Sequence, residues 1–482
     1  MTALLTRLAD LPPGVARPGH DPQAHGAGIL HLGLGAFHRA HQAVYTDDAL
    51  AAGGGDWRIV GANLHSRAVP QAMAAQNHLY TVLERGERTT ARVIAAHAAT
   101  MGGDPAAILR AASDPAIRIV TLTVSEKGYG IDRLAMDLDP AHPDVAADLA
   151  RPDAPRGVLG LLTAALAARR AAGMAPFTAL SCDNLPDNGR LLRAGILGFA
   201  RRTDPDLAAW IADTVAFPCC MVDRITPAPT AATEADALAL TGFEDRASVE
   251  TEPFRQWVIE DHFPTDRPAW EAGGAQFTTD VRAWEAMKLR MLNGAHSLIA
   301  YGGQLAGLAT VREVMADAGL APLVARHMRA AAATLPGGLD PDAYGRALTA
   351  RFANPGLAHE TAQIAMDGTE KLPQRWFAPA LELLAQGGDL RPYAFASALW
   401  LGWLAMLARA GTAPPDPRGA QLLALARAAG NDAGKLADIL ALPGLAAPSL
   451  CAAPAFRAPL LATLSHLHSH GLRATVTAEL AP

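Results

Sequence analysis

A lysine, an asparagine and a histidine lie close together around residue 290, and their chemistry suits proton transfer. Lys288, Asn293 and His296, with Glu285, would share one sector of a helix that turns about 100° per residue. A leucine and an isoleucine fall in the same sector, which is typical of a buried site. A lysine there would have a lowered pKa and could take an alcohol proton while hydride leaves carbon. A snorkelling lysine beside a core histidine explains the spacing equally well.

A second asparagine could help Asn293 to hold a developing alkoxide. Asn184 lies in the segment SCDNLPDNG, directly after a predicted strand at Phe177–Ser181. Ligands bind at the carboxyl ends of the strands in open α/β sheets, so this position favours a role in the site. The alternative is an asparagine-rich turn selected for its backbone conformation.

A glycine pair marks a candidate dinucleotide site near the N-terminus. Gly33 and Gly35 lie between a predicted strand, Gly28–Leu34, and a predicted helix from His38 to about Ala52. Glycines at such a turn let the backbone approach a pyrophosphate. His38 stands where the third glycine of the G-x-G-x-x-G pattern is expected, so the pattern is incomplete and a plain tight turn remains an alternative.

The residues after the next predicted strand, Trp57–Leu64, would face the adenosine ribose. An acid is expected there to bind the 2′-hydroxyl group of NAD, but the segment continues as His65-Ser66-Arg67-Ala68. Arg67 could instead meet the 2′-phosphate of NADP, or it could be a solvated loop residue. The choice between NAD and NADP is therefore open.

The elements that must position these residues differ between the two halves of the chain. Strand-like runs, including Ile117–Val124, alternate with helical ones such as Leu161–Ala172 in the first half, which predicts a parallel α/β sheet. After about Phe277 the pattern becomes amphipathic and helical. We therefore expect an α/β, Rossmann-type domain at residues 1–278 and a mostly helical substrate domain at residues 279–482. The later helices are predicted at Trp284–Tyr301, Leu323–Thr334, Pro379–Ala385, Phe395–Ala410 and Ala420–Ala429.

Composition narrows the class of protein. Of 482 residues, 50% are apolar and 18% are charged, which suits two buried cores, and a net charge of −6 gives no reason to bind nucleic acid or anionic lipid. The four cysteines lack CxxC spacing, which favours a reducing compartment and disfavours a structural zinc site. The N-terminus does not resemble a signal peptide, and the apolar run 392–408 is too short to span a bilayer and predicts a buried helix. We expect a cytoplasmic protein without membrane partners, either a monomer or a small homo-oligomer.

Six segments together resemble the mannitol dehydrogenase family, the long-chain polyol dehydrogenases that include mannitol 2-dehydrogenases and fructuronate reductases. They are HLGLGAFHRAHQAVYTDDAL, TLTVSEKGY, SCDNLPDNGR, FPCCMVDRITP, EPFRQWVIEDHF and KLRMLNGAHS. The resemblance implies NAD-dependent catalysis without a metal, with NADP not excluded, by a Lys-x4-Asn-x2-His motif. Lys288 would then be the general acid/base, and Asn293 would form an oxyanion hole with Asn184. The cofactor residues expected on this basis are Gly33, Gly35, Ala36, Phe37, Arg39 and Asp223, and Glu285 would lie near the substrate.

The substrate depends on whether the site can bind a carboxylate. Lys127 stands where the mannitol enzymes tend to have glycine, and Arg375 and Lys371 lie in a stretch, QIAMDGTEKLPQR, that resembles the uronate reductases. Such cations would bind the carboxylate of D-fructuronate or D-mannonate, whereas each could also be a surface charge. We expect a D-fructuronate/D-mannonate enzyme, with D-mannitol/D-fructose as the alternative substrate pair. A zinc-dependent alcohol dehydrogenase and a non-catalytic dinucleotide sensor are more remote alternatives.

Overall fold

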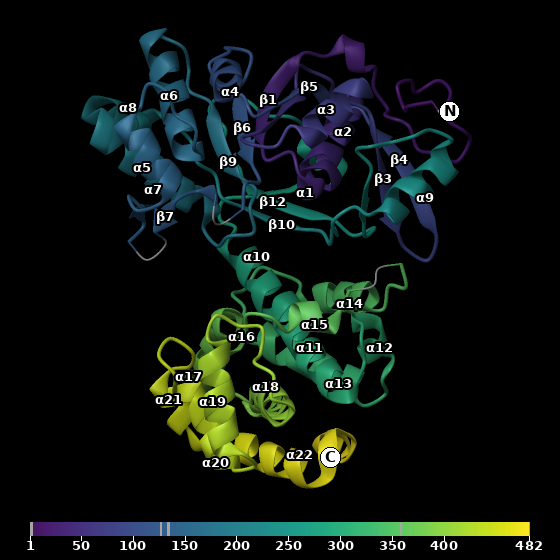
Figure 1. The fold of residues 1–482 in the computed structure, drawn as a ribbon, viewed down its shortest axis with the longest axis vertical. Coiled ribbons are helices and arrows are strands. Elements are labelled where there is room, and N and C mark those ends of the chain that lie inside the picture. The colour runs from purple at the N-terminus through teal and green to yellow at the C-terminus, as the bar shows by residue number, and fades with distance from the viewer. Residues whose placement is uncertain (1–2, 126–127, 133–134, 357–358, 482) are drawn as a thin grey trace. The chain divides into compact units, whose positions relative to one another are not determined.

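The computed structural model describes residues 3–125, 128–132, 135–356 and 359–481. The chain divides into two compact units, Met1–Arg282 and Ala283–Pro482 (Figure 1). The second unit begins inside helix α10 (Arg282–Met287), whereas the sequence placed the boundary at residue 278, where the last strand ends.

Unit 1 is built on a five-stranded sheet in which every pair of neighbouring strands is parallel, as the sequence predicted. The strand order is β5-β2-β1-β6-β9, so the order reverses direction at β1, as in Rossmann-type folds. The strands are β1 (Ala27–Leu32), β2 (Arg58–Asn63), β5 (His97–Gly102), β6 (Ile119–Leu122) and β9 (Thr178–Ser181).

Helices cover both faces of this sheet, because successive side chains of a strand point to opposite faces. On β1, Ile29 packs into the core formed with α1 (Ala36–Ala40) and α2 (Gln42–Gly53). Leu30 and Leu32 pack into the opposite core. The helices on that side are α4 (Pro105–Ala112), α6 (Val158–Ala171) and α7 (Asn188–Thr203). Burial on both faces explains why these strands read as continuous apolar runs.

Two three-stranded sheets in unit 1 were not predicted. One has the order β11-β3-β4 and the other β10-β12-β13. Their strands are β3 (Tyr80–Arg85), β4 (Thr89–Ile94), β10 (Cys220–Asp223), β11 (Val249–Thr251), β12 (Gln256–Glu260) and β13 (Gln276–Thr278). Unit 1 also contains η1 (Pro22–Ala24), α3 (Ala68–Ala75), β7 (Ile131–Asp132), β8 (Asp137–Leu138), α5 (Pro143–Ala150), α8 (Pro205–Thr214), α9 (Ala231–Thr241) and η3 (Trp270–Gly273).

Unit 2 is helical and packs around one large core, at the centre of which lies α18 (Arg391–Ala410). This helix is long and apolar enough to cross a membrane, but 78% of its most apolar window is buried, which fits a core helix. It packs against α11 (Gly294–Ala306), α13 (Leu320–Ala332), α19 (Gly419–Ala429) and α22 (Pro454–Leu480). The other helices are α12 (Val311–Ala316), α14 (Pro341–Phe352), α15 (Thr361–Ile364), α16 (Gly368–Leu372), α17 (Ala378–Ala385), α20 (Ala433–Ala437), η6 (Asp438–Ala441) and α21 (Pro448–Ala452).

Two segments of unit 2 form π-helical turns, η4 (Lys288–Asn293) and η5 (Pro373–Phe377). The single α-helix predicted at 284–301 is therefore wrong in detail: α10, η4 and α11 follow one another along this stretch. A π-turn is wider than an α-turn, so the angular positions calculated for an α-helix do not apply across η4. Such turns occur often at functional sites.

Candidate functional site

The turn after β1 requires glycine at its first position. Gly33 has a φ of 101°, and a Cβ atom there would lie 2.1 Å from the carbonyl oxygen of Thr123, the residue that follows β6. The turn is held by hydrogen bonds from the Gly33 amide to the Ala62 carbonyl, 2.8 Å, and from the Leu34 amide to Asn63 Oδ1, 2.7 Å. The backbone of β1 thus approaches both of its neighbours closely at this end of the sheet.

The space beside Gly35 is open. Gly35 is exposed, and the nearest atom to a Cβ placed there is the Gly33 carbonyl oxygen, 3.8 Å away. Ala36 and Phe37 follow directly, half-buried, at the start of α1. An unobstructed glycine turn where the strand order reverses is where a dinucleotide pyrophosphate binds in Rossmann-type folds. These residues therefore fit the cofactor that the sequence predicts.

Arg39 lies inside unit 1 with only 4% of its surface exposed. Its guanidinium group donates hydrogen bonds to the carbonyl oxygens of Gly35, at 3.2 Å, and Ala247. Burial lowers its pKa. Arg39 thus stabilises the glycine turn from inside unit 1, and its guanidinium group already donates hydrogen bonds to backbone carbonyl groups.

Three buried histidines lie together at the turn, a cluster that the sequence analysis did not predict. The rings of His31 and His38 stack with centroids 3.4 Å apart, and His38 Nε2 lies 3.1 Å from His97 Nε2. His31 also lies 3.1 Å from the Gly33 carbonyl oxygen. Burial lowers the pKa of His31 to about 3 and lowers the pKa values of His38 and His97 well below their ordinary value. Alternation along β1 could have predicted that His31 shares a face with Ile29.

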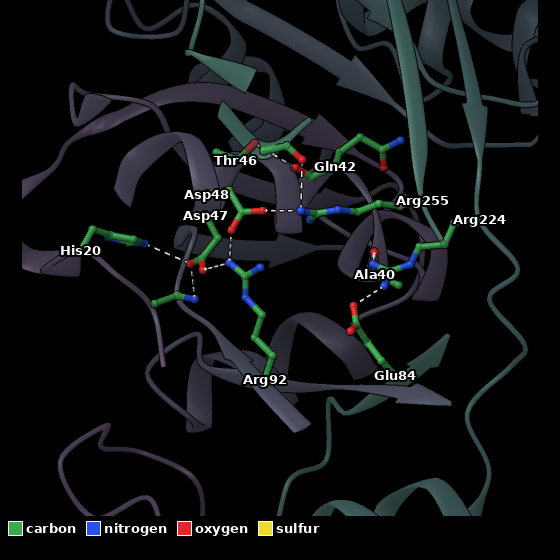
Figure 2. A network of polar contacts seen from close by, with 12 residues as sticks. His20, Ala40, Gln42, Thr46, Asp47, Asp48, Glu84, Arg92, Arg224 and Arg255 are labelled. Atoms are coloured by element: carbon green, nitrogen blue, oxygen red, sulfur yellow. Dashed lines mark hydrogen bonds and ion pairs between the residues drawn. The ribbon is translucent and has the colours of Figure 1, made fainter. Parts of the chain in front are cut away.

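A network of charged groups fixes α2, which follows the turn (Figure 2). The fully buried carboxylate of Asp47 accepts hydrogen bonds from Arg92 at 2.7 Å and from the Ala95 amide at 3.0 Å. Arg92 and Arg255 both pair with Asp48 as well. Nearby, Arg224 binds the last carbonyl group of α1, that of Ala40, at 2.5 Å (Figure 2). The position of α1 and α2 is therefore set by ion pairs as well as by packing.

The loop after β2 is exposed from His65 to Ala68. Arg67 donates a hydrogen bond from Nη2 to the Gly103 carbonyl oxygen, 3.1 Å. The loop thus presents a cation and no acid at the position where an acid usually binds the adenosine ribose.

Asn184 and Asp223 lie at the ends of two different strands of unit 1. Asn184 is exposed and lies three residues after the end of β9. The preceding residue, Asp183, accepts hydrogen bonds from the amides of Val124 and Ser125, both 3.0 Å. Asp223 ends β10 with 6% of its surface exposed. Asp183 therefore fixes the loop that carries Asn184.

In unit 2 the two π-turns pack against each other and bring Arg375 to the predicted lysine motif. Arg375 Nη1 donates hydrogen bonds to the Asn293 carbonyl oxygen, 3.3 Å, and to Ser297 Oγ, 3.0 Å. Trp376 Nε1 donates to the Gly294 carbonyl oxygen, 3.0 Å. Lys288 and Asn293, half-buried, stand at the two ends of η4.

The charge of Arg375 has no anionic partner among the described residues. Its contacts are neutral oxygens, and burial lowers its pKa to about 10. A buried guanidinium group without an ion pair is expected to bind an anion, because an uncompensated charge is costly to desolvate. Lys371, another predicted carboxylate ligand, differs: its ammonium group donates to the Met366 carbonyl oxygen, 2.7 Å, and lies 3.7 Å from Asp367.

His296 is buried on α11 with cations around it. Its pKa lies well below the ordinary value, first because of burial and then because of His359, Arg351 and Arg375. The imidazole is therefore neutral at neutral pH. His359 is a further residue that the sequence analysis missed, and no motif in the sequence marks it.

The remaining predicted residues are placed as follows. Glu285 is half-buried on α10, one turn before Lys288. Lys127 lies outside the described residues. Within the part of the chain that the structure describes, no group of three or more His, Cys, Asp or Glu residues could hold a metal ion.

Comparison with known proteins identifies the family. Residues 27–272 match the mannitol dehydrogenase Rossmann domain, and residues 280–455 match the mannitol dehydrogenase C-terminal domain. The D-mannonate oxidoreductase of Escherichia coli is 40% identical over 98% of this chain and 100% of its own length. A mannitol 2-dehydrogenase of Cereibacter sphaeroides is 44% identical over 80% of this chain and 82% of its own.

A solved structure agrees with this assignment over the whole chain. The Pseudomonas fluorescens mannitol 2-dehydrogenase, in a ternary complex with NAD and D-mannitol, superimposes with a TM-score of 0.83 at 35% identity, covering 100% of this chain and 99% of that one. These findings confirm the resemblance that the six sequence segments indicated. The chain belongs to the mannitol dehydrogenase family of oxidoreductases, which act on CH–OH groups.

Proposed function

We propose that this enzyme reduces D-fructuronate to D-mannonate, and catalyses the reverse oxidation, with NAD(H). The observation that carries the proposal is Arg375, a largely desolvated guanidinium group beside Asn293 that forms no ion pair with a described residue. A substrate carboxylate would complete its coordination with charge-assisted hydrogen bonds. The full-length similarity to a D-mannonate oxidoreductase supports the same substrate class.

The motif residues would divide the chemistry between them. NAD(H) supplies or accepts the hydride. Lys288 gives a proton to the reacting oxygen during reduction and takes it back during oxidation. The side-chain amides of Asn293 and Asn184 donate hydrogen bonds to that oxygen while it carries negative charge. His296, which is neutral, binds a neighbouring hydroxyl group. We propose that this chemistry needs no metal, so activity should survive treatment with a chelator.

The experiment that tests the substrate assignment is a charge change at Arg375 assayed with a charged and a neutral substrate. Arg375→Gln should raise the KM for D-fructuronate about 10- to 100-fold, because a hydrogen-bonded charge pair contributes about 1.5–3 kcal/mol. The KM for D-fructose should change far less. Arg326→Gln is the matched control, since Arg326 is a half-buried arginine of unit 2 paired with Glu479. Equal losses with both substrates would contradict the carboxylate assignment.

A neutral polyol is the second candidate substrate. The relatives include mannitol 2-dehydrogenases, and one solved relative holds D-mannitol. A panel of D-fructuronate, D-fructose, D-mannitol and D-mannonate with both NAD(H) and NADP(H) separates the two assignments. Preference for D-fructose over D-fructuronate would replace our proposal by mannitol 2-dehydrogenase activity.

The same panel determines whether the enzyme uses NAD(H) or NADP(H). We infer NAD from the NAD-containing relative, whereas Arg67 and the missing acid after β2 favour tolerance of NADP. Cofactor binding without turnover of any member of the panel would instead favour a dinucleotide sensor.

A further inference from the structure

Two imidazole rings lie against each other beside the lysine motif. The ring centroids of His296 and His359 are 5.1 Å apart, with the planes at 83°. The His296 ring also contacts Phe352, with centroids 4.7 Å apart. His296 belongs to α11, Phe352 ends α14, and His359 lies just before α15. Three separate segments of unit 2 thus converge on one imidazole.

Neither histidine ring forms a hydrogen bond with a described residue. His296 Nε2 and His359 Nδ1 are buried nitrogen atoms without a partner. Buried polar atoms in native proteins are nearly always hydrogen-bonded, so this unpartnered pair beside the lysine motif leaves hydrogen-bonding capacity for a ligand. The pKa values of both histidines are lowered by burial, so each ring is neutral and offers one donor and one acceptor. A hydroxyl group, which also donates and accepts, is their natural partner.

The backbone around His359 is fixed without help from its side chain. The His359 carbonyl oxygen accepts a hydrogen bond from the Val311 amide, 3.0 Å, and the Thr361 amide donates to the Ala309 carbonyl oxygen, 2.9 Å. Thr361 Oγ1 also donates to the Leu308 carbonyl oxygen, 2.9 Å. These bonds tie the segment to the chain that follows α11. The backbone that carries the imidazole is therefore fixed without using the ring nitrogens.

We propose that His359 is a second substrate-binding imidazole, which hydrogen-bonds a hydroxyl group of the polyhydroxy substrate beside the hydroxyl group bound by His296. This inference rests on the proposed function, because it assumes a sugar acid or polyol at the lysine motif. It assigns the carboxylate to Arg375 and a hydroxyl group to His359. His359 then contributes to the affinity and selectivity for polyhydroxylated chains, while proton transfer belongs to Lys288.

The test compares two substitutions that differ in what they preserve. His359→Phe keeps the ring contact with His296 and removes both nitrogens, whereas His359→Asn keeps hydrogen-bonding capacity and removes the ring. With the intact enzyme and NADH, His359→Phe should raise the KM for D-fructuronate about tenfold, with kcat changing much less. His359→Asn should raise it less than His359→Phe. His468→Phe is the control, because His468 is a histidine of unit 2 outside the lysine motif, with Nδ1 3.2 Å from the Asn431 carbonyl oxygen.

Binding and stability measurements exclude a merely structural role. The affinity for NADH and the melting temperature of His359→Phe should stay close to those of the wild type. A KM within twofold of the wild type in the folded His359→Phe enzyme would overturn the proposal. So would a KM that rises more in His359→Asn than in His359→Phe, because the ring contact and not the nitrogen would then be what matters.

Failure of the proposed function would look different. If the wild-type enzyme acts on D-mannitol and D-fructose but not on D-fructuronate, the uronate assignment fails while the hydroxyl assignment of His359 can still be measured. The same two variants are then assayed with D-mannitol and NAD, and the same difference between them is expected. If the two variants raise the KM equally, on either substrate, the inference about His359 is overturned while the proposed function is unaffected.

Discussion

Lys288 is the residue on which the proposed chemistry most depends, and its effect should be separable from cofactor binding. Lys288→Ala removes the group that exchanges a proton with the reacting oxygen, so kcat should fall about 100- to 10,000-fold. The glycine turn that fits the dinucleotide lies in unit 1, so binding of NADH, followed by its fluorescence, should persist. Lys435→Ala, in α20 of the same unit, is a control for the loss of a lysine. Near-normal turnover by the Lys288 variant would contradict the mechanism.

Gly33 and Gly35 offer a matched pair of substitutions at the dinucleotide turn. Gly33→Ala forces a Cβ atom to 2.1 Å from the Thr123 carbonyl oxygen at a φ of 101°, so it should lower the melting temperature and abolish NADH binding. Gly35→Ala meets no atom closer than 3.8 Å, so the protein should keep its stability. Its added methyl group should nevertheless weaken NADH binding, because it occupies the side from which a pyrophosphate approaches. Calorimetry and NADH titration measure both effects, and equal stability losses in the two variants would refute this account of the turn.

At the scale of elements, the sequence predicted most strands of the parallel sheet, which are buried on both faces. The strands β1, β2, β6 and β9 were anticipated because apolar residues occur on both of their faces. The strands β3 and β4 were not, because they mix apolar residues with threonine, arginine and glutamate, as in YTVLER and TTARVI. Packing between distant segments decides where such sequences pair. The predicted helix at 38–52 also begins earlier, at Ala36, and is interrupted at His41.

The motif residues were recognisable from the sequence, but their environment was not. Spacing identified Lys288, Asn293 and His296 as candidates, yet it did not reveal the π-turn between the first two or its packing against η5. The partners of His296 come from residues 352 and 359, which are more than 50 positions away in the chain. A helical wheel cannot show contacts of this kind. Arg375 was predicted from its sequence context to be a carboxylate ligand. Its hydrogen bonds to Asn293 and Ser297, beside the lysine motif, are consistent with that prediction.

Gly294 directly follows η4 and lies close to the backbone of η5, so a substitution there should disturb both π-turns. A Cβ atom at this position would lie 3.1 Å from His327 Nε2 and 3.3 Å from the Arg375 carbonyl oxygen, both closer than an ordinary contact. Gly294→Ala should therefore cost about 1–3 kcal/mol of stability and displace Arg375, which raises the KM for a uronate. Chemical denaturation and steady-state kinetics measure the two effects.

A second substitution tests whether the crowding is the cause. His327→Asn shortens the side chain that a methyl group at position 294 would meet, so Gly294→Ala should be less destabilising in that background. The two substitutions are expected to couple, since the residues are in contact. Additive effects on stability would show that the loss arises elsewhere.

For the whole molecule, buried neutral histidines should make stability depend steeply on pH. His31, His38, His41 and His97 of unit 1 all have pKa values lowered by burial, to about 3 for His31 and His41. The unfolded chain binds a proton at each below about pH 6.5, whereas the folded chain does not, so stability is present above that pH and is lost as the pH falls toward 3. Each histidine should cost about 1.4 kcal/mol per pH unit in this range. The urea midpoint of unfolding should thus fall sharply between pH 7 and pH 5, and less sharply in His97→Gln, whereas His65→Gln, at an exposed position, should behave as the wild type. A midpoint that stays constant over this range would show that these histidines can be protonated without unfolding the protein.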